Sequence, residues 1–109
     1  MQIRKSLTEY ETELDGANFK LRQLSEVELE EVNYYFIDSI KAGHTVLPPK
    51  AVKLCLQYAL LNWSGVKGED GFDLKYEKGQ EDYLPFKARN ILASEIFVRS
   101  QMSEEEKKS

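Results

Sequence analysis

The sequence has little of the chemistry on which enzymes and metalloproteins depend. Among its 109 residues there is one cysteine, Cys55, and one histidine, His44. A single cysteine excludes an intrachain disulfide and gives no metal-ligand spacing, so a reducing compartment fits best. Every usual general-base arrangement would have to pass through His44, which lies in a connection after Gly43, so we expect no catalytic histidine. We expect Cys55 to pack as a small hydrophobe, not to act as a nucleophile.

The short motifs of phosphate, acyl and metal chemistry are missing as well. There is no Walker glycine-rich loop and no G-x-S-x-G, H-E-x-x-H or C-x-x-C pattern. The acidic turn at residues 69–73 is only faintly similar to a calcium loop, because it lacks alternating Asp or Asn ligands and a closing Glu. The sequence therefore predicts a protein that is not an enzyme, with no cofactor, metal ion or small-molecule substrate.

Long apolar runs and an excess of positive charge are also absent. No stretch approaches the roughly 18 apolar residues of a membrane span, and the N-terminus has no apolar core of a signal peptide. The formal net charge is −4, so binding to a phosphate backbone would need a local basic patch. We expect a cytoplasmic protein that binds neither membrane nor nucleic acid. The acids concentrated at residues 9–38 are interpreted as solvated surface, with docking of a basic partner as the alternative.

What the chain does contain suits one globular domain. A hydrophobic fraction of 41% at this length supports a core without disulfides. No internal repeat and no Pro-rich or Gly/Ser-rich linker divides the chain. The last residues, 103–109, carry no apolar side chain, so we expect a domain over residues 1–102 and a charged, mobile tail over 103–109.

The N-terminal part predicts a β-hairpin over residues 10–24. Asp15 and Gly16 supply the two positive-φ positions that a type I′ turn needs. The register that follows pairs Thr12 with Phe19 and Tyr10 with Leu21 on an apolar face, and Glu11 with Lys20 and Glu9 with Arg22 on a charged face. Two strands alone are marginal in water, so this hairpin must pack on helices or gain further strands.

A first helix is expected to begin at Ser25. Ser25 and Glu28 have the spacing of a capping box, and Leu24 and Leu29 are placed as a hydrophobic staple. Gly43 is expected to end the helix as a C-cap. The predicted core-facing stripe consists of Leu29, Val32, Phe36 and Ile40, widened by Tyr35 and Ile37.

A second helix, predicted to run from Pro49 to about Asn62, is the most apolar part of the chain. Its helical spacing places Val52, Cys55, Leu56, Ala59, Leu60 and Trp63 on one face and Leu54, Tyr58 and Leu61 on a second face. A helix that is apolar on two faces must be covered on more than one side. The covering element is the rest of the chain, a copy of the chain in a homo-oligomer, or a partner protein.

The remainder predicts a small loop or hairpin and a third helix. After an Asp70-Gly71 turn, apolar residues alternate with charged ones over residues 72–76, which favours a short strand with Val66 as its partner. The third helix is expected over residues 84–101. The predicted fold class is α+β and mainly α, with an N-terminal β-hairpin packed on a three-helix core. Trp63 is expected to cap the core with its indole N–H turned to water or a loop carbonyl, and Gly65 to let the chain turn beneath the ring.

The passage after the second helix carries a resemblance to a known family. The residues that carry it are Trp63, Gly65, Val66, Glu69, Asp70, Gly71, Leu74 and Tyr76, followed by a Leu-Pro entry into a helix that closes in Ser-Glu-Glu-Glu-Lys-Lys. This pattern resembles the small tail assembly chaperones of long-tailed bacteriophages and prophages. The likeness covers roughly residues 10–107, and it marks Trp63, Gly65, Val66, Asp70 and Gly71 as a structural turn motif.

The resemblance implies a non-enzymatic protein of the bacterial host cytoplasm that binds the helical tape measure protein during tail morphogenesis. We expect helix-in-groove binding between the first two helices. The candidate partner-binding residues are Tyr34, Tyr35, Leu54, Tyr58 and Leu61. Two alternatives remain open, namely a structural virion subunit near the tail end or baseplate and an acidic inhibitor that mimics nucleic acid.

Overall fold

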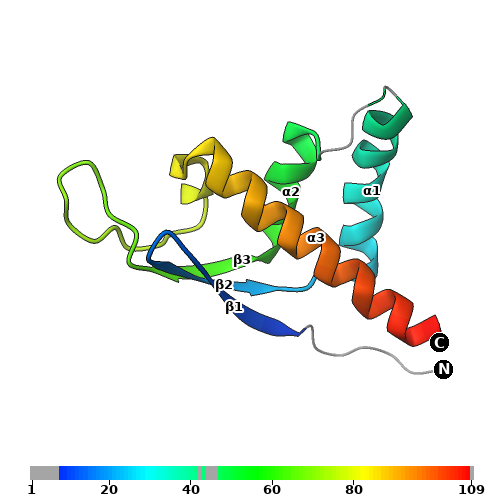
Figure 1. Ribbon diagram of the computed structural model, residues 1–109, viewed down its shortest axis with the longest axis horizontal. Coiled ribbons are helices and arrows are strands. Elements are labelled where there is room, and N and C mark those ends of the chain that lie inside the picture. Colours follow the sequence, from blue (N-terminus) through cyan, green and yellow to red (C-terminus); the bar gives the residue numbers. More distant parts are fainter. Residues whose placement is uncertain (1–7, 42, 44–46, 109) are drawn as a thin grey trace.

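The computed structural model describes residues 8–41, 43 and 47–108, with side chains described except at 38–40 and 102–108. The elements are β1 (Glu9–Leu14), β2 (Ala17–Arg22), α1 (Glu26–Lys41), α2 (Pro49–Ala59), β3 (Leu60–Ser64), the short 3-10 helix η1 (Gln80–Tyr83) and α3 (Phe86–Lys108). The three helices cover one face of an antiparallel sheet with the strand order β1-β2-β3 (Figure 1). His44 and Ser109 lie outside the described residues, as do the side chains of Ile40 and of residues 102–108.

The hairpin prediction is confirmed in turn type and register. Asp15 and Gly16 have φ values of 51° and 81°, which a type I′ turn requires. The cross-strand partners are those expected, from Leu14 opposite Ala17 to Glu9 opposite Arg22. Side chains of β2 alternate between buried and exposed positions, so the hairpin presents one apolar face to the helices.

The predicted fold class is wrong, because the hairpin is part of a three-stranded sheet. The third strand, β3, comes from residues 60–64, whereas the sequence predicts that the second helix continues to about Asn62. Helix α2 ends at Ala59, and Leu60 is extended with φ −82° and ψ 113°. β3 then pairs antiparallel with β2. Since the open edge of β2 carries unpaired backbone groups, pairing there outweighs one more helical turn.

A bulge explains why β3 has the apolar spacing of a helix. Lys20 lies opposite Asn62 and Leu21 lies opposite Leu60, so Leu61 has no partner on β2. In a regular strand Leu60 and Trp63 would point to opposite faces. The extra residue in the bulge turns both toward the core, where both are buried.

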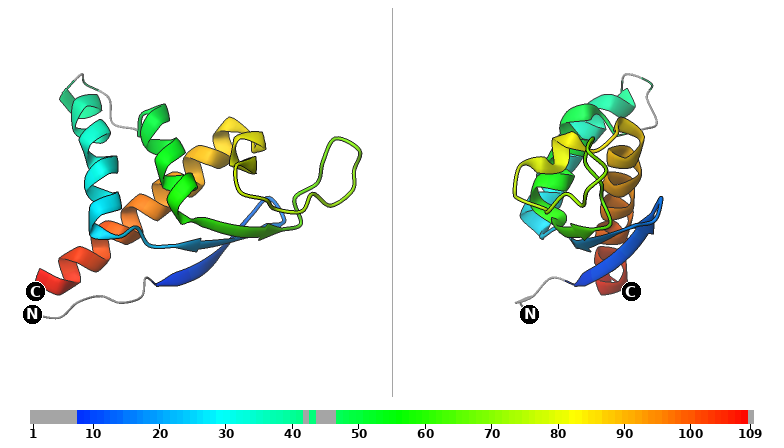
Figure 2. Two further views of the ribbon diagram at one scale, coloured as in Figure 1. Left: turned by 180° about the vertical axis from the view of Figure 1, so that it is seen from behind. Right: turned by 90° about the vertical axis from the view of Figure 1, so that its left-hand side faces the viewer.

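The N-terminus of α1 forms as predicted. The backbone N–H of Glu28 donates to Ser25 Oγ over 3.2 Å, and that of Ser25 donates to Glu28 Oε1 over 2.9 Å. Leu24 and Leu29 are both buried in the core. Ser100 of α3 is buried beside them, with its Oγ accepting the Leu24 N–H at 2.9 Å. The capping box therefore lies where α3 crosses the entry to α1 (Figure 2).

Between β3 and η1 the chain extends away from the body as a loop (Figure 1). The predicted pairing with Val66 is present, since the Leu74 N–H donates to the Val66 carbonyl over 2.7 Å. The expected strand is reduced to an isolated bridge between Lys67 and Asp73. Phe72, the first residue of the expected strand, is exposed.

Candidate partner-binding surface

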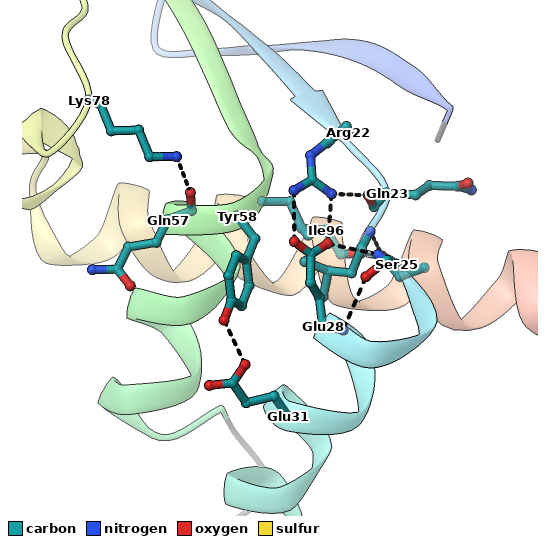
Figure 3. Close-up of polar contacts among 11 residues, drawn as sticks. Arg22, Gln23, Ser25, Glu28, Glu31, Gln57, Tyr58, Lys78 and Ile96 are labelled. Atoms are coloured by element: carbon teal, nitrogen blue, oxygen red, sulfur yellow. Dashed lines mark hydrogen bonds and ion pairs between the residues drawn. The ribbon is translucent and has the colours of Figure 1, made fainter. Parts of the chain in front are cut away.

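The seam between α1 and α2, expected to be a binding groove, is filled by the chain's own side chains. Tyr58 of α2 donates its hydroxyl to the Glu31 carboxylate of α1 over 2.6 Å (Figure 3). This hydrogen bond favours the protonated phenol and raises the pKa of Tyr58. The Lys50 ammonium lies 5.1 Å from the centroid of the Tyr35 ring. Tyr35, Leu54 and Tyr58 are half-buried against the core, and the contacts of Tyr35 and Tyr58 join the two helices.

A second contact fixes the start of α1 to the sheet. The Arg22 guanidinium donates two hydrogen bonds to the Glu28 carboxylate, at 2.7 and 2.9 Å (Figure 3). The paired hydrogen bonds from Arg22 are the main reason that the pKa of Glu28 is lowered and that of Arg22 is raised. Arg22 thus faces Glu28, while Lys20 pairs with Glu9 at 3.4 Å. Helix α1 is held at its first turn by a bidentate ion pair.

Leu61, the fifth candidate residue, lies apart from the seam. It is the unpaired residue of the β3 bulge and is half-buried. It is not among the apolar side chains that pack on the core. The structure therefore packs Tyr35, Leu54 and Tyr58 on the core and leaves Leu61 at the sheet.

The outer side of α1 carries exposed apolar side chains. Val27 is 75% exposed, Tyr34 67% and Ile37 49%. Steps of seven and three residues place these three on one side of the helix, and we call them the α1 stripe. The Tyr34 ring packs edge-on against Tyr35 with centroids 5.3 Å apart, which limits the freedom of its side chain.

A shallow hollow of about 470 Å³ accompanies the α1 stripe. Its lining residues are Glu26, Leu29, Glu30, Asn33, Tyr34 and Ile37. Leu29, Tyr34 and Ile37 give this lining its apolar and aromatic part, and Glu26 and Glu30 contribute carboxylates. Such a surface suits a partner segment with an apolar side and basic flanks.

Sequence reasoning identified one member of this surface and missed two. Tyr34 was a candidate, whereas Ile37 was assigned to the widened core stripe and Val27 was not considered. The missed signal was available in the helical spacing. Val27 and Tyr34 are about two helical turns apart, and both lie on the side of α1 opposite the buried Val32.

The turn motif is explained by packing. The Trp63 indole N–H donates to the Leu74 carbonyl over 2.7 Å, which confirms that Trp63 caps the core against a loop carbonyl. Its ring packs edge-on against Phe19 and Tyr76, with centroids 6.3 and 4.9 Å away. These contacts fix the base of the loop on the sheet.

The reason for Gly65 differs from the expected one. Gly65 has φ +77°, and a Cβ there would lie 3.1 Å from the Gly16 carbonyl oxygen. A glycine is therefore needed because the chain packs closely against the β1–β2 turn, and not because it turns beneath the indole ring. At the loop tip the Asp70 carboxylate accepts the Phe72 N–H at 3.1 Å, and Gly71 has φ +82°. Half-buried Val66 packs against the core.

The one cysteine of the sequence, Cys55, lies in the core of the described structure. Cys55 is fully buried, and burial raises the pKa of its thiol to about 12. Among the described residues, no group of three or more His, Cys, Asp or Glu side chains is placed to hold a metal ion.

Within the described ranges, no helix combines the length and apolar character needed to cross a lipid bilayer. No family model, curated protein or solved structure matches this chain. The likeness to tail assembly chaperones thus depends on the residues quoted for it above.

Proposed function

We propose that this chain is a non-enzymatic assembly chaperone that holds an amphipathic helix of its partner along the outer side of α1. The α1 stripe is the observation that carries this proposal. Val27 and Tyr34 are each more than two-thirds exposed, although they lie on a helix whose other side is buried in the core. Clustered exposed apolar side chains are typical of interaction sites, whereas scattered ones are not.

The spacing of the α1 stripe favours a helical partner. Anchors separated by three and seven residues are the pattern by which two helices pack along their length. Tyr34 supplies a large amphipathic contact of the kind enriched at interface centres. The Glu30 carboxylate beside it favours Lys or Arg on the flanks of the incoming helix. The hydrogen bond between Tyr58 and Glu31 ties α2 to α1, the helix that carries this surface.

The resemblance to phage tail assembly chaperones supplies the identity of the proposed partner. It is the long helical tape measure protein, bound in the cytoplasm of the bacterial host until the tail tube forms around it. The excess of acidic residues in the chain, with a net charge of −4, suits a basic or amphipathic partner.

Co-expression with the tape measure protein of the same phage tests the proposal. The tape measure protein should become soluble and should purify together with this chain. The double variant V27S/I37S should fold normally, because both side chains are exposed, and should lose the complex. The proposal fails if the tape measure protein neither gains solubility nor co-purifies with the wild-type chain.

Mass spectrometry of purified phage particles separates a chaperone from a virion subunit. A chaperone leaves before the tail is complete, so its peptides should be absent from the particles. Peptides present in stoichiometric amounts would instead identify the chain as a structural component.

A further inference from the structure

The two edge strands of the sheet, β3 and β1, differ in the hydrogen bonding of their backbone groups. In β3 the backbone N–H of Trp63 donates to Asn62 Oδ1 over 2.9 Å. The Leu60 carbonyl accepts a hydrogen bond from the Tyr76 hydroxyl at 3.1 Å. Side chains of the chain itself therefore occupy two backbone groups of β3, the Trp63 N–H and the Leu60 C=O.

Within the described part of the chain, no hydrogen bond engages the outer backbone groups of β1. In a hairpin with a two-residue turn, the residues that flank the turn exchange hydrogen bonds, and every second pair does so thereafter. This alternation continues to the end of the hairpin, where the Gln23 N–H donates to the Thr8 carbonyl over 2.9 Å. The N–H and C=O groups of Glu9, Glu11 and Glu13 consequently point away from β2. Among the described residues, no strand pairs with that edge.

β1 is held in place on its core-facing side. Thr12 donates its hydroxyl to the Glu95 carboxylate of α3 over 2.6 Å. The Arg99 guanidinium lies 4.1 Å from the centroid of the Tyr10 ring. The strand contains no proline and no bulge, which are two common means of blocking an edge. The edge is thus ordered before any partner arrives, which lowers the entropic cost of binding.

The charges on β1 define what the edge accepts. Glu9, Glu11 and Glu13 are exposed on the same face of the strand. Glu9 pairs with Lys20, whereas Glu11 and Glu13 have no ion pair among the described residues. A second copy of β1 would bring carboxylates against carboxylates, which is unfavourable across strands. Charge complementarity therefore excludes self-pairing and favours a basic strand.

We propose that the open edge of β1 accepts an extended segment of a partner protein that carries Lys or Arg at alternate positions. The basic side chains lie opposite Glu9, Glu11 and Glu13, and the outward backbone groups of these residues complete the ladder. The intervening side chains lie beside Tyr10 and Thr12, where β-branched apolar residues fit. This surface is separate from the α1 stripe and does not depend on the proposed function.

The test uses the acetylated and amidated peptide Thr-Lys-Val-Lys-Val-Lys-Thr, titrated into the ¹⁵N-labelled full chain and followed by NMR. The amide signals of Glu9, Glu11 and Glu13 should shift, and added salt should weaken binding. Glu11→Pro removes one outward N–H without touching the ladder to β2, so it should weaken binding about tenfold. The Glu-for-Lys version of the peptide should not bind.

Two further variants keep the result interpretable if Glu11→Pro disturbs the hairpin. Glu11→Gln keeps the backbone donor and removes the charge, so binding should weaken and lose part of its salt dependence. Glu77→Gln makes the same change at an exposed position away from the sheet edge and should bind the peptide like the wild type. The proposal is overturned if the shifts fall outside β1, if the acidic peptide binds equally well, or if Glu11→Gln behaves like Glu77→Gln.

Discussion

At the scale of single residues, burial decides the chemistry of Cys55. The thiol is fully buried and its pKa is raised to about 12, so little thiolate exists at moderately alkaline pH. We predict that iodoacetamide does not alkylate the native protein at pH 8 but does so rapidly in concentrated urea. Intact-mass measurements over time distinguish these cases. Equal labelling rates in the two conditions would show that the thiol is accessible in the native state.

Glu28 is the residue whose ionisation contributes most clearly to stability. Replacing it by Gln preserves an acceptor for the Ser25 N–H but removes the bidentate pair with Arg22. Because both side chains are less than one-quarter exposed, we expect the free energy of unfolding at pH 7 to fall by about 1–2 kcal/mol. Urea denaturation of the wild type and Glu28→Gln measures this difference.

The same pair predicts a pH dependence with a definite sign. The pKa of folded Glu28 is lowered from its ordinary value of 4.5. The contribution of Glu28 to the free energy of unfolding is therefore complete above the ordinary pKa. It is lost as the pH falls through the lower pKa of the folded state. The stability difference between the wild type and Glu28→Gln should shrink steadily below pH 4.5. A difference that stays constant down to acid unfolding would contradict the assigned role of the carboxylate.

At the scale of elements, substitutions at two glycines distinguish the cost of a strained backbone from the cost of a close contact. Gly65 and Gly71 have similar positive φ values, but only Gly65 has a neighbour near the position of an added Cβ. Substitution by Ala should cost about 1 kcal/mol at Gly71, from the backbone alone, and about 2–3 kcal/mol at Gly65. Thermal or urea unfolding of the two variants measures the difference. Equal losses of stability in the two variants would mean that the contact between Gly65 and the β1–β2 turn relaxes without a cost in free energy.

Elements whose boundaries depend on local chemistry were predictable from the sequence. The hairpin follows from Asp15-Gly16, and the start of α1 follows from the Ser25–Glu28 capping box. β3 was not predictable from periodicity, because Leu60 and Trp63 have helical spacing and reach the same face only through the bulge at Leu61. The need of β2 for a partner on its second edge is a tertiary effect that a local pattern does not contain.

The candidate site was predictable only in part for a related reason. Aromatic residues on α1 indicated a surface, and Tyr34 belongs to it. Whether Tyr58 lines a groove or closes one depends on Glu31, which is far away in the sequence and meets it only after α1 and α2 pack. Exposure of Val27 and Ile37 likewise depends on which side of α1 the sheet and α3 cover.

At the scale of the whole molecule, the helices lie on one side of the sheet (Figures 1 and 2), and the two surfaces proposed for partners, the α1 stripe and the β1 edge, belong to different elements. The α1 stripe suits an amphipathic helix, and the β1 edge suits a basic extended segment. Both surfaces are bordered by carboxylates. The two proposed surfaces would give an acidic chain two ways to bind basic or amphipathic segments, and their like charges would oppose association between copies.

The central claim is that the outer side of α1 binds the partner, and one paired measurement tests it most directly. Tyr34 and Tyr83 are exposed to 67% and 75%, respectively, so Tyr34→Ser and Tyr83→Ser make the same change on and off the α1 stripe. Isothermal titration of each variant with a helical segment of the tape measure protein measures the affinity. We predict that Tyr34→Ser weakens binding about tenfold or more and that Tyr83→Ser leaves it unchanged. Equal affinities of the two variants would contradict the account.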